Sequence, residues 1–240
     1  MKKNFWIAGK QAVLESIRNP NRNVLKVVGS LNSDLDNICK SKNISFEQIS
    51  VSKIKKFLNS ESVNHQNHLA LIEELDLITV KDLLKNNSAE SIVILDGVTD
   101  TRNIGSIIRS CVCFGIDAVI VDQRIFKRNN IHLYKAASGA MEYMNIIEVS
   151  NIKNAMSELK KNSFFIYGMD ANASTDISKI SWSKKTVFVF GSEDEGLKLS
   201  IKKECDYLIK IQNNSKIDSL NVSNACSSTL AIYDYIKKKA

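Results

Sequence analysis

The segment Asp96–Gly105 is the first part of the chain whose residue types could support chemistry. It follows the β-type run Ile92–Leu95 and leads into a predicted helix that carries Arg109. We expect Asn103 to cap that helix, since asparagine is a preferred N-cap residue. An arginine six residues further on can hydrogen-bond the phosphate or ribose oxygens of a ligand. A capped helix with one solvated arginine explains this isolated pattern better, so a functional interpretation needs support from other segments.

A second segment, Gly191–Gly196, places two glycines around three acids directly after the apolar run Val187–Phe190. Glycine leaves backbone groups open to a flat ligand, and Glu193 can accept hydrogen bonds from a sugar or a base. The carboxylates would repel an anion such as pyrophosphate. Three acids could hold Mg²⁺, but the further carboxylates that such a site needs are not evident elsewhere in the sequence. We therefore predict no metal.

A third polar segment joins the β-type run that ends at Ile211 to the last predicted helix. Ser219, Asn221 and Ser223 supply two hydroxyls and an amide where that helix begins. One of them is expected to be the N-cap, but one cap does not require three polar groups around Leu220. Small residues at 225–228 follow, and they would permit close packing of another chain segment.

The elements that must position these segments alternate between short apolar runs and amphipathic stretches. The predicted strands are Ile92–Leu95, Ala118–Val121, Phe164–Tyr167, Val187–Phe190 and Leu208–Ile211, and the predicted helices are Ile104–Phe114, Ile152–Lys160, Leu197–Lys203 and Leu220–Ile236. Such a pattern predicts an α/β fold with a parallel sheet covered on both faces. Ligands bind outside the carboxyl ends of the strands in these sheets, which is where the three polar segments begin.

The first 78 residues are predicted to form a smaller α/β unit. A helix is expected over Lys10–Ile17, ending before Pro20. Strands are expected at Val24–Val28 and Leu69–Ile72, with a helix at Asp34–Cys39 between them. The polar stretch 79–91 is expected to be a linker, and residues 92–240 to form the second domain.

Composition narrows the class of protein. The 240 residues are 44% hydrophobic and 25% charged, as in globular proteins, with 33 basic against 26 acidic side chains and a net charge of +7. The positive balance is compatible with a polyanionic partner. No apolar run approaches the roughly 18 residues of a membrane span, and Phe5–Ala8 is too short for a secretory signal, so a cytoplasmic protein is expected. The five cysteines indicate neither zinc nor disulfides, and Cys111 and Cys113 are expected to be buried.

Taken together, the three segments resemble the motifs of the SpoU (TrmH-type) RNA ribose 2′-O-methyltransferases of the SPOUT class. The matching residues are 103–109 for the first motif, Gly191–Glu193 with Gly196 for the second, and 219–223 with Ala225 for the third; Ser138–Ala140 with Glu142 also resembles the family. The resemblance covers about residues 92–236.

The resemblance implies a catalytic domain with a C-terminal trefoil knot, which ordinary topology rules would not predict. It implies that S-adenosylmethionine binds largely to backbone groups at Gly191, Ile211 and Leu220. The catalytic residues would be Arg109, as the essential group, with Asn103, Glu193, Ser219 and Asn221 placing the ribose and the cofactor. The active site would form across a homodimer interface.

The third motif departs from the family pattern. The family usually shows a proline and then a glycine after the strand, whereas Gln212–Ser215 stands here. Because the loop lacks the rigidity of proline and the freedom of glycine, we expect weaker cofactor binding.

Residues 1–78 resemble a ribosomal-protein-like substrate-binding domain, through Trp6–Val13 and His65–His68. This implies a guanosine of large-subunit ribosomal RNA as the substrate. Transfer RNA is the alternative substrate, and an RNA-binding or assembly protein without methyl transfer is the alternative class. A nicotinamide-dependent dehydrogenase is disfavoured because no GxGxxG fingerprint occurs after Leu95. His65 and His68 could contact RNA or could simply be the polar end of a strand.

Overall fold

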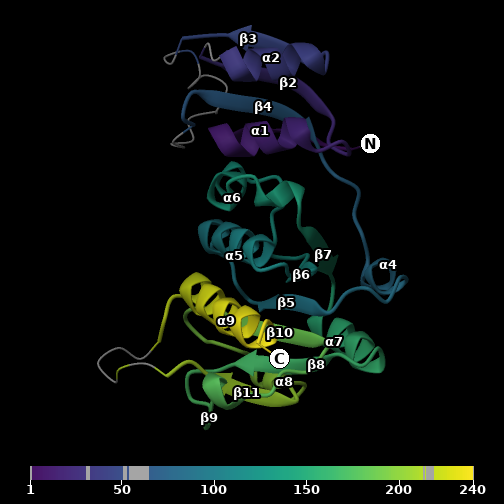
Figure 1. Cartoon of the computed structure of the whole chain (residues 1–240), viewed down its shortest axis with the longest axis vertical. Helices are drawn as coiled ribbons and strands as arrows, with labels where there is room; N and C mark the ends of the chain where they lie inside the picture. Colours follow the sequence, from purple (N-terminus) through teal and green to yellow (C-terminus); the bar gives the residue numbers. More distant parts are fainter. Residues whose placement is uncertain are drawn as a thin grey trace. The chain divides into compact units, whose positions relative to one another are not determined.

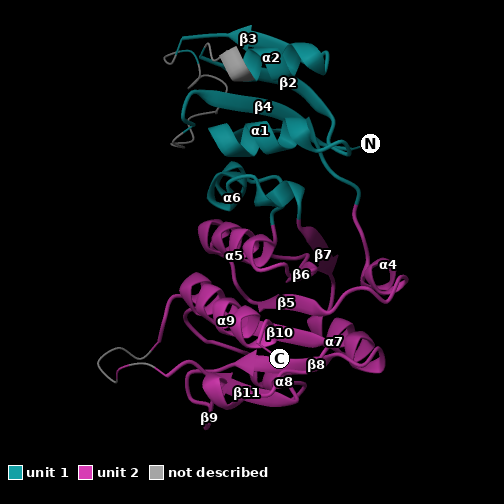
Figure 2. Ribbon diagram, in the orientation of Figure 1, with its two compact units in different colours: residues 1–76, 127–143 teal, residues 77–126, 144–240 magenta. Residues whose placement is uncertain are grey.

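The computed structural model describes residues 2–30, 33–50, 53, 65–212, 214 and 219–239. The chain divides into two compact units, Met1–Asp76 with Lys127–Tyr143, and Leu77–Phe126 with Met144–Ala240 (Figure 2). Residues 127–143 therefore belong by their contacts to the first unit, although they lie within the predicted second domain. The three-part functional division of the chain stays a prediction.

The second unit contains a parallel sheet, as predicted for this part of the chain. Among the described residues its strand order is β7-β6-β5-β10-β8-β11-β9, and all neighbouring strands in it pair in parallel. The strands are β5 (Ser91–Asp96), β6 (Ala118–Asp122), β7 (Asn145–Val149), β8 (Phe165–Met169), β9 (Thr175–Asp176), β10 (Thr186–Gly191) and β11 (Tyr207–Lys210). The helices are α4 (Val80–Leu84), α5 (Thr101–Cys113), α7 (Ile152–Lys161), η2 (Ile177–Lys179), α8 (Leu199–Lys202) and α9 (Val222–Lys237) (Figure 1).

Both faces of this sheet carry apolar side chains. Alternate strand residues such as Ile94 and Val189 form one core with Met156 and Leu159 of α7. On the opposite face the ring of Phe188 lies 5.0 Å from that of Tyr233 in α9. Because a strand alternates its side chains between two faces, a fully buried run such as β5 needs helices on both sides. The predicted α/β fold is confirmed.

The first unit has a mixed sheet of order β1-β4-β2-β3 in its described residues. Its strands are β1 (Asn4–Ala8), β2 (Val24–Gly29), β3 (Ser45–Gln48) and β4 (His68–Glu73), and its helices are α1 (Lys10–Arg18), α2 (Ser33–Ser41), α6 (Ile131–Ala137) and η1 (Ala140–Glu142). The predicted helix before Pro20 is confirmed. β1, β3 and α6 were not predicted.

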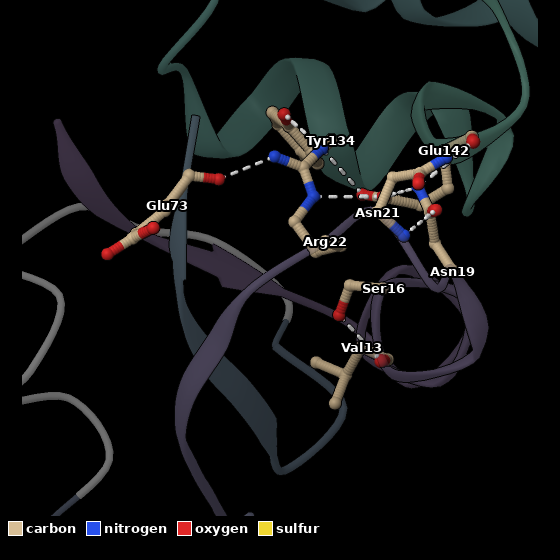
Figure 3. A network of polar contacts seen from close by, with 8 residues as sticks. All are labelled: Val13, Ser16, Asn19, Asn21, Arg22, Glu73, Tyr134 and Glu142. Atoms are coloured by element: carbon tan, nitrogen blue, oxygen red, sulfur yellow. Dashed lines mark hydrogen bonds and ion pairs between the residues drawn. The ribbon is translucent and has the colours of Figure 1, made fainter. Parts of the chain in front are cut away.

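A buried ion pair fixes residues 127–143 within the first unit (Figure 3). Arg22 donates through Nε to Glu142 across 2.9 Å, and both side chains are 1% exposed. The same guanidinium donates to the backbone oxygen of Glu73 at 2.6 Å and to the Tyr134 hydroxyl at 3.3 Å. Burial alone would lower the pKa of Arg22, but Tyr134 and Glu142 raise it above its ordinary value, so Arg22 stays charged. Glu142, noted in the sequence for its motif, is thus an internal partner of Arg22.

His68 opens β4 and is buried, with its Nδ1 2.5 Å from the backbone oxygen of Gln66. His65 accepts a hydrogen bond at Nδ1 from the backbone of Asn67 at 2.9 Å. Both rings thus take part in the local structure of the turn that precedes β4.

Candidate active site

Three side chains from the three polar segments meet at the carboxyl edge of the second unit's sheet. Asn103 donates through Nδ2 to Glu193 Oε1 across 3.0 Å. Asn221 donates through its own Nδ2 to Asn103 Oδ1 across 3.2 Å, and to Glu193 Oε1. Because β5 and β10 are neighbours in the sheet, the loops that follow them are brought side by side. The sequence prediction that these polar segments converge therefore agrees with the geometry.

The helix that carries Asn103 begins earlier than predicted. Asp100, not Asn103, is the N-cap of α5, and its Oδ1 accepts a hydrogen bond from the backbone of Arg102 at 2.8 Å. Hydrogen bonds from the side chain and backbone of Arg102 lower the pKa of Asp100, so the cap is ionised at neutral pH. Because Asp100 takes over capping, Asn103 lies in the first turn with its amide free to contact Glu193.

Glu193 is presented by a tight turn that two glycines make possible. Ser192 and Gly196 exchange backbone hydrogen bonds of 3.2 and 3.0 Å. A Cβ added at Gly191 would lie 2.0 Å from the carbonyl carbon of Gly196, so a side chain cannot fit there. Gly196 has a φ of +67°, in the left-handed region that favours glycine.

Asn221 both caps α9 and joins the polar cluster. Its Oδ1 accepts hydrogen bonds from the Ser223 backbone at 3.0 Å and from the Ser223 hydroxyl at 2.6 Å. Its Nδ2 contacts Asn103 and Glu193, as described above. The helix N-cap thus fixes the amide that closes the cluster.

A cavity of about 310 Å³ lies beside this cluster. All three predicted cofactor-binding residues line it, namely Gly191, Ile211 and Leu220, together with the predicted catalytic residues Glu193 and Ser219. Its volume is at the lower end of the range typical of small-molecule sites. Of the unusual segment Gln212–Ser215, residues 213 and 215 lie outside the described residues.

A second cavity, of about 550 Å³, lies on the other side of the turn 192–196, which lines both. Asn103, Asp96 and Asp122 are among the residues that line it. Asp96 is 2% exposed and accepts a hydrogen bond from the Lys198 backbone at 3.0 Å. A hydrogen bond from the Arg124 side chain, and a weaker effect of one from its backbone, lower the pKa of Asp122, although burial of that carboxylate raises it.

Arg109 does not join the cluster. It is exposed on α5 and is not among the described residues that line either cavity. Six helical residues separate it from Asn103, which amounts to roughly 9 Å of rise and a turn of about 240°. The two side chains therefore leave the helix on different faces.

Cys226 of the small-residue segment 225–228 is buried, with Cys111 of α5 as its neighbour. Burial and Cys226 raise the pKa of the Cys111 thiol. The small residues thus permit close contact between α9 and α5 of the same chain. Cys113 is exposed, contrary to expectation, because residues two apart on a helix point in nearly opposite directions.

Four polar residues that line the first cavity were not predicted from the sequence as site residues. Asp170 and Asn172 follow β8, and Lys202 and Lys210 come from α8 and β11. Asp170 directly follows an apolar run, which was a usable signal. What the sequence does not reveal is that β8 lies between β10 and β11.

No group of three or more histidine, cysteine or acidic side chains in the described residues could hold a metal ion. No helix in the described ranges has the length and apolar character needed to cross a membrane.

Comparison with known proteins gives consistent matches. Residues 90–231 match the model of the SpoU rRNA Methylase family. The chain is 33% identical, over 95% of both chains, to the 23S rRNA (guanosine-2′-O-)-methyltransferase RlmB of Xylella fastidiosa. It is 31% identical to a Staphylococcus aureus protein assigned to the TrmH family tRNA/rRNA methyltransferases, over 97% of this chain and 96% of that protein. The SpoU methyltransferase AviRb of Streptomyces viridochromogenes, solved with AdoMet, shares the fold with a TM-score of 0.82 and 16% identity, over 99% of this chain and 92% of that one.

Proposed function

Because the chain belongs to the SpoU rRNA Methylase family of RNA methyltransferases, we propose that it methylates the ribose 2′-hydroxyl of a guanosine in large-subunit ribosomal RNA. The methyl donor is S-adenosylmethionine. The observation that carries this proposal is the hydrogen-bonded cluster of Asn103, Glu193 and Asn221 beside a cavity lined by Gly191 and Leu220. The RlmB relative, which matches nearly the whole chain, supports the choice of ribosomal RNA.

The lining of the first cavity fits this donor. Ile211, Leu220 and Val222 offer apolar surface to an adenine ring, while Glu193 and Asp194 suit a ligand with a positive sulfonium. When bound, the donor supplies an electrophilic methyl group. The bond between that methyl carbon and the donor's sulfur would break as the C–O bond to the ribose forms; S-adenosylhomocysteine would leave with the electron pair, and the hydroxyl proton would pass to solvent.

The chain's own residues act on the ribose. The amides of Asn103 and Asn221 and the carboxylate of Glu193 hold the ribose hydroxyls in position, and Ser219, which lines the first cavity, helps to place the ribose and the cofactor. An arginine stays protonated near neutral pH, so Arg109 stabilises the developing alkoxide and orients an RNA phosphate rather than removing the proton.

We further propose that the chain is a homodimer that acts in the cytoplasm. The exposed Arg109 faces away from the Asn103 cluster of its own chain, which supports an active site completed across a subunit interface. Residues 1–78 serve as the RNA-binding domain, residues 79–91 as the linker and residues 92–240 as the catalytic domain with the C-terminal trefoil knot.

The test is methyl transfer from labelled S-adenosylmethionine to unmodified bacterial ribosomal RNA and, in parallel, to transfer RNA, with 2′-O-methyl mapping. We expect label on one ribose of ribosomal RNA. Label on transfer RNA alone would support methyl transfer but contradict the proposed ribosomal RNA substrate. Transfer RNA is tested because the name of the Staphylococcus aureus relative includes both RNAs. No label on either RNA, with no binding of the donor, would favour an RNA-binding protein without methyl transfer.

A further inference from the structure

One wall of the first cavity carries charges that the proposed roles of Gly191, Ile211 and Leu220 leave unexplained. This wall is built by Met169 at the end of β8, by residues 170–172 that follow it, and by Lys202 at the end of α8. Asp170 and Lys202 form an ion pair of 2.6 Å in it, with side chains that are 10% and 25% exposed. A charged pair so deeply placed in a cavity wall is available to a ligand and largely shielded from solvent.

The backbone around Asp170 is fixed. Its N–H donates to the oxygen of Ile209 in β11 at 2.9 Å, and its own oxygen accepts from Ala173 at 3.0 Å. Its Oδ1 accepts from the backbone of Asn172 at 2.9 Å. Although burial opposes the charge, the hydrogen bonds from Lys202 and Asn172 lower the pKa of Asp170. The carboxylate is therefore charged and held in one orientation.

The pair has hydrogen-bonding capacity left. A carboxylate offers about four acceptor positions, and the contacts of Asp170 with Asn172 and Lys202 use two of them. An ammonium group carries three donors, of which Lys202 directs one at Asp170. A ligand with one positive and one negative group can bind both partners without adding net charge to the wall.

S-adenosylmethionine carries such a pair of groups at its amino-acid end, an α-ammonium and an α-carboxylate. Backbone groups can hydrogen-bond its adenine and ribose, but they neutralise no charge. Glu193, Asp194 and Glu195 also line the cavity, but as acids they can complement only the ammonium group. Asp170 and Lys202 are an acid and a base bound to each other in the lining of the cavity, and together they complement both groups of the amino-acid end.

We propose that Asp170 binds the α-ammonium group of the methyl donor and Lys202 binds its α-carboxylate. This inference rests on the proposed methyltransferase function and gives these two residues the role of recognising the donor's amino-acid end.

Calorimetric titration with three adenosine thioethers tests the inference. S-adenosylhomocysteine has both amino-acid charges, 5′-(3-aminopropylthio)-5′-deoxyadenosine keeps only the ammonium, and 5′-methylthioadenosine has neither. The variants are Asp170→Asn and Lys202→Met. Lys203→Met is the matched control, since it removes a neighbouring lysine that is exposed and is not among the described residues lining the cavity.

We expect Asp170→Asn to weaken binding of the first two ligands about tenfold, as for the loss of one charged hydrogen bond. Lys202→Met should weaken only S-adenosylhomocysteine to that extent, and Lys202→Arg should retain its binding. Methylthioadenosine should bind every variant with an affinity within about twofold of the original, which also reports that the cavity is still folded. Lys203→Met should bind all three ligands normally.

Three outcomes count against the inference. If the variants weakened all three ligands equally, Asp170 and Lys202 would contact the adenosine part or would only stabilise the fold. If the variants bound all three ligands normally, the pair would have no role in binding the donor. Failure of the unaltered chain to bind S-adenosylhomocysteine would instead overturn the proposed function itself, and this inference with it.

Discussion

The Nδ2 of Asn221 donates to the Oδ1 of Asn103 across 3.2 Å, although 118 residues separate them in the chain. Asn221 makes this contact while its Oδ1 caps α9. The bond therefore links the start of α9 to the first turn of α5. Substitutions at Asn221 can therefore separate its capping of α9 from its contact with Asn103.

Asn221→Ser should retain the cap but lose the contacts with Asn103 and Glu193, because serine is a good N-cap with a shorter side chain. We expect methyl transfer to fall at least about tenfold with little change in thermal stability. Asn221→Ala should lose the same activity and also about 1 kcal/mol of stability. Both are measured by initial rates and by thermal unfolding. A serine variant with normal activity would remove Asn221 from the site.

Position 191 must be a glycine because the backbone of Gly196 occupies the space that a side chain would need. Gly191→Ala should distort the turn that carries Glu193, because its Cβ would fall 2.0 Å from a backbone carbon. We expect binding of S-adenosylhomocysteine to weaken more than about tenfold. Gly196→Ala is the control: it meets nothing within 4 Å and carries only the strain of a positive φ, about 1 kcal/mol. Equal effects of the two substitutions on binding would contradict this account of the turn.

The Arg22–Glu142 pair should dominate the stability of the first unit. Glu142→Gln leaves a buried guanidinium short of its charge partner, and such a loss costs about 3–5 kcal/mol. The double variant Arg22→Met with Glu142→Leu should recover much of that loss, since it leaves no unpaired charge. Urea unfolding measures both variants.

The pair of Arg18 and Glu15 is the control for that experiment, because the Arg18 side chain is 57% exposed. Arg18→Gln should cost less than about 1 kcal/mol. The same small cost for Glu142→Gln would show that the buried pair contributes little.

Burial raises the pKa of the Cys205 thiol to about 12. The thiol of the unfolded chain has a lower pKa, so the folded state favours the protonated form. This stabilisation is complete below the unfolded pKa, near 9, and is lost as the pH rises from there toward 12. Alkylation of the folded chain at pH 8 should therefore label the exposed Cys113 first. Mass spectrometry of the labelled peptides would refute this if Cys205 reacted as fast as Cys113.

Much of the candidate site could be predicted because its residues follow recognisable apolar runs. Asn103, Glu193 and Asn221 each lie shortly after such a run, and parallel strands end at the same edge of a sheet. The position of Asp100 as the cap was missed because aspartate and asparagine are both favoured there, and local sequence does not say which begins the helix.

The remaining features depend on contacts over long distances in the chain. Asp170 lines the first cavity because β8 lies between β10 and β11. The order of strands in a sheet cannot be predicted from any single segment of the sequence. The Arg22–Glu142 pair joins residues 120 positions apart. Arg22 has no local pattern that distinguishes it from a solvated charge, and the motif around Glu142 does not reveal its partner.

Single-turnover methyl transfer to unmodified ribosomal RNA by an Arg109→Ala variant tests the central claim most directly. Arg102→Ala is the matched control, since Arg102 lies on the same helix, is 79% exposed and pairs with Asp100. We predict that Arg109→Ala lowers the rate about 10²–10³-fold, keeps its affinity for S-adenosylhomocysteine and unfolds at the original temperature. Arg102→Ala should stay close to the original rate. A near-normal rate for Arg109→Ala would contradict the proposed catalytic mechanism.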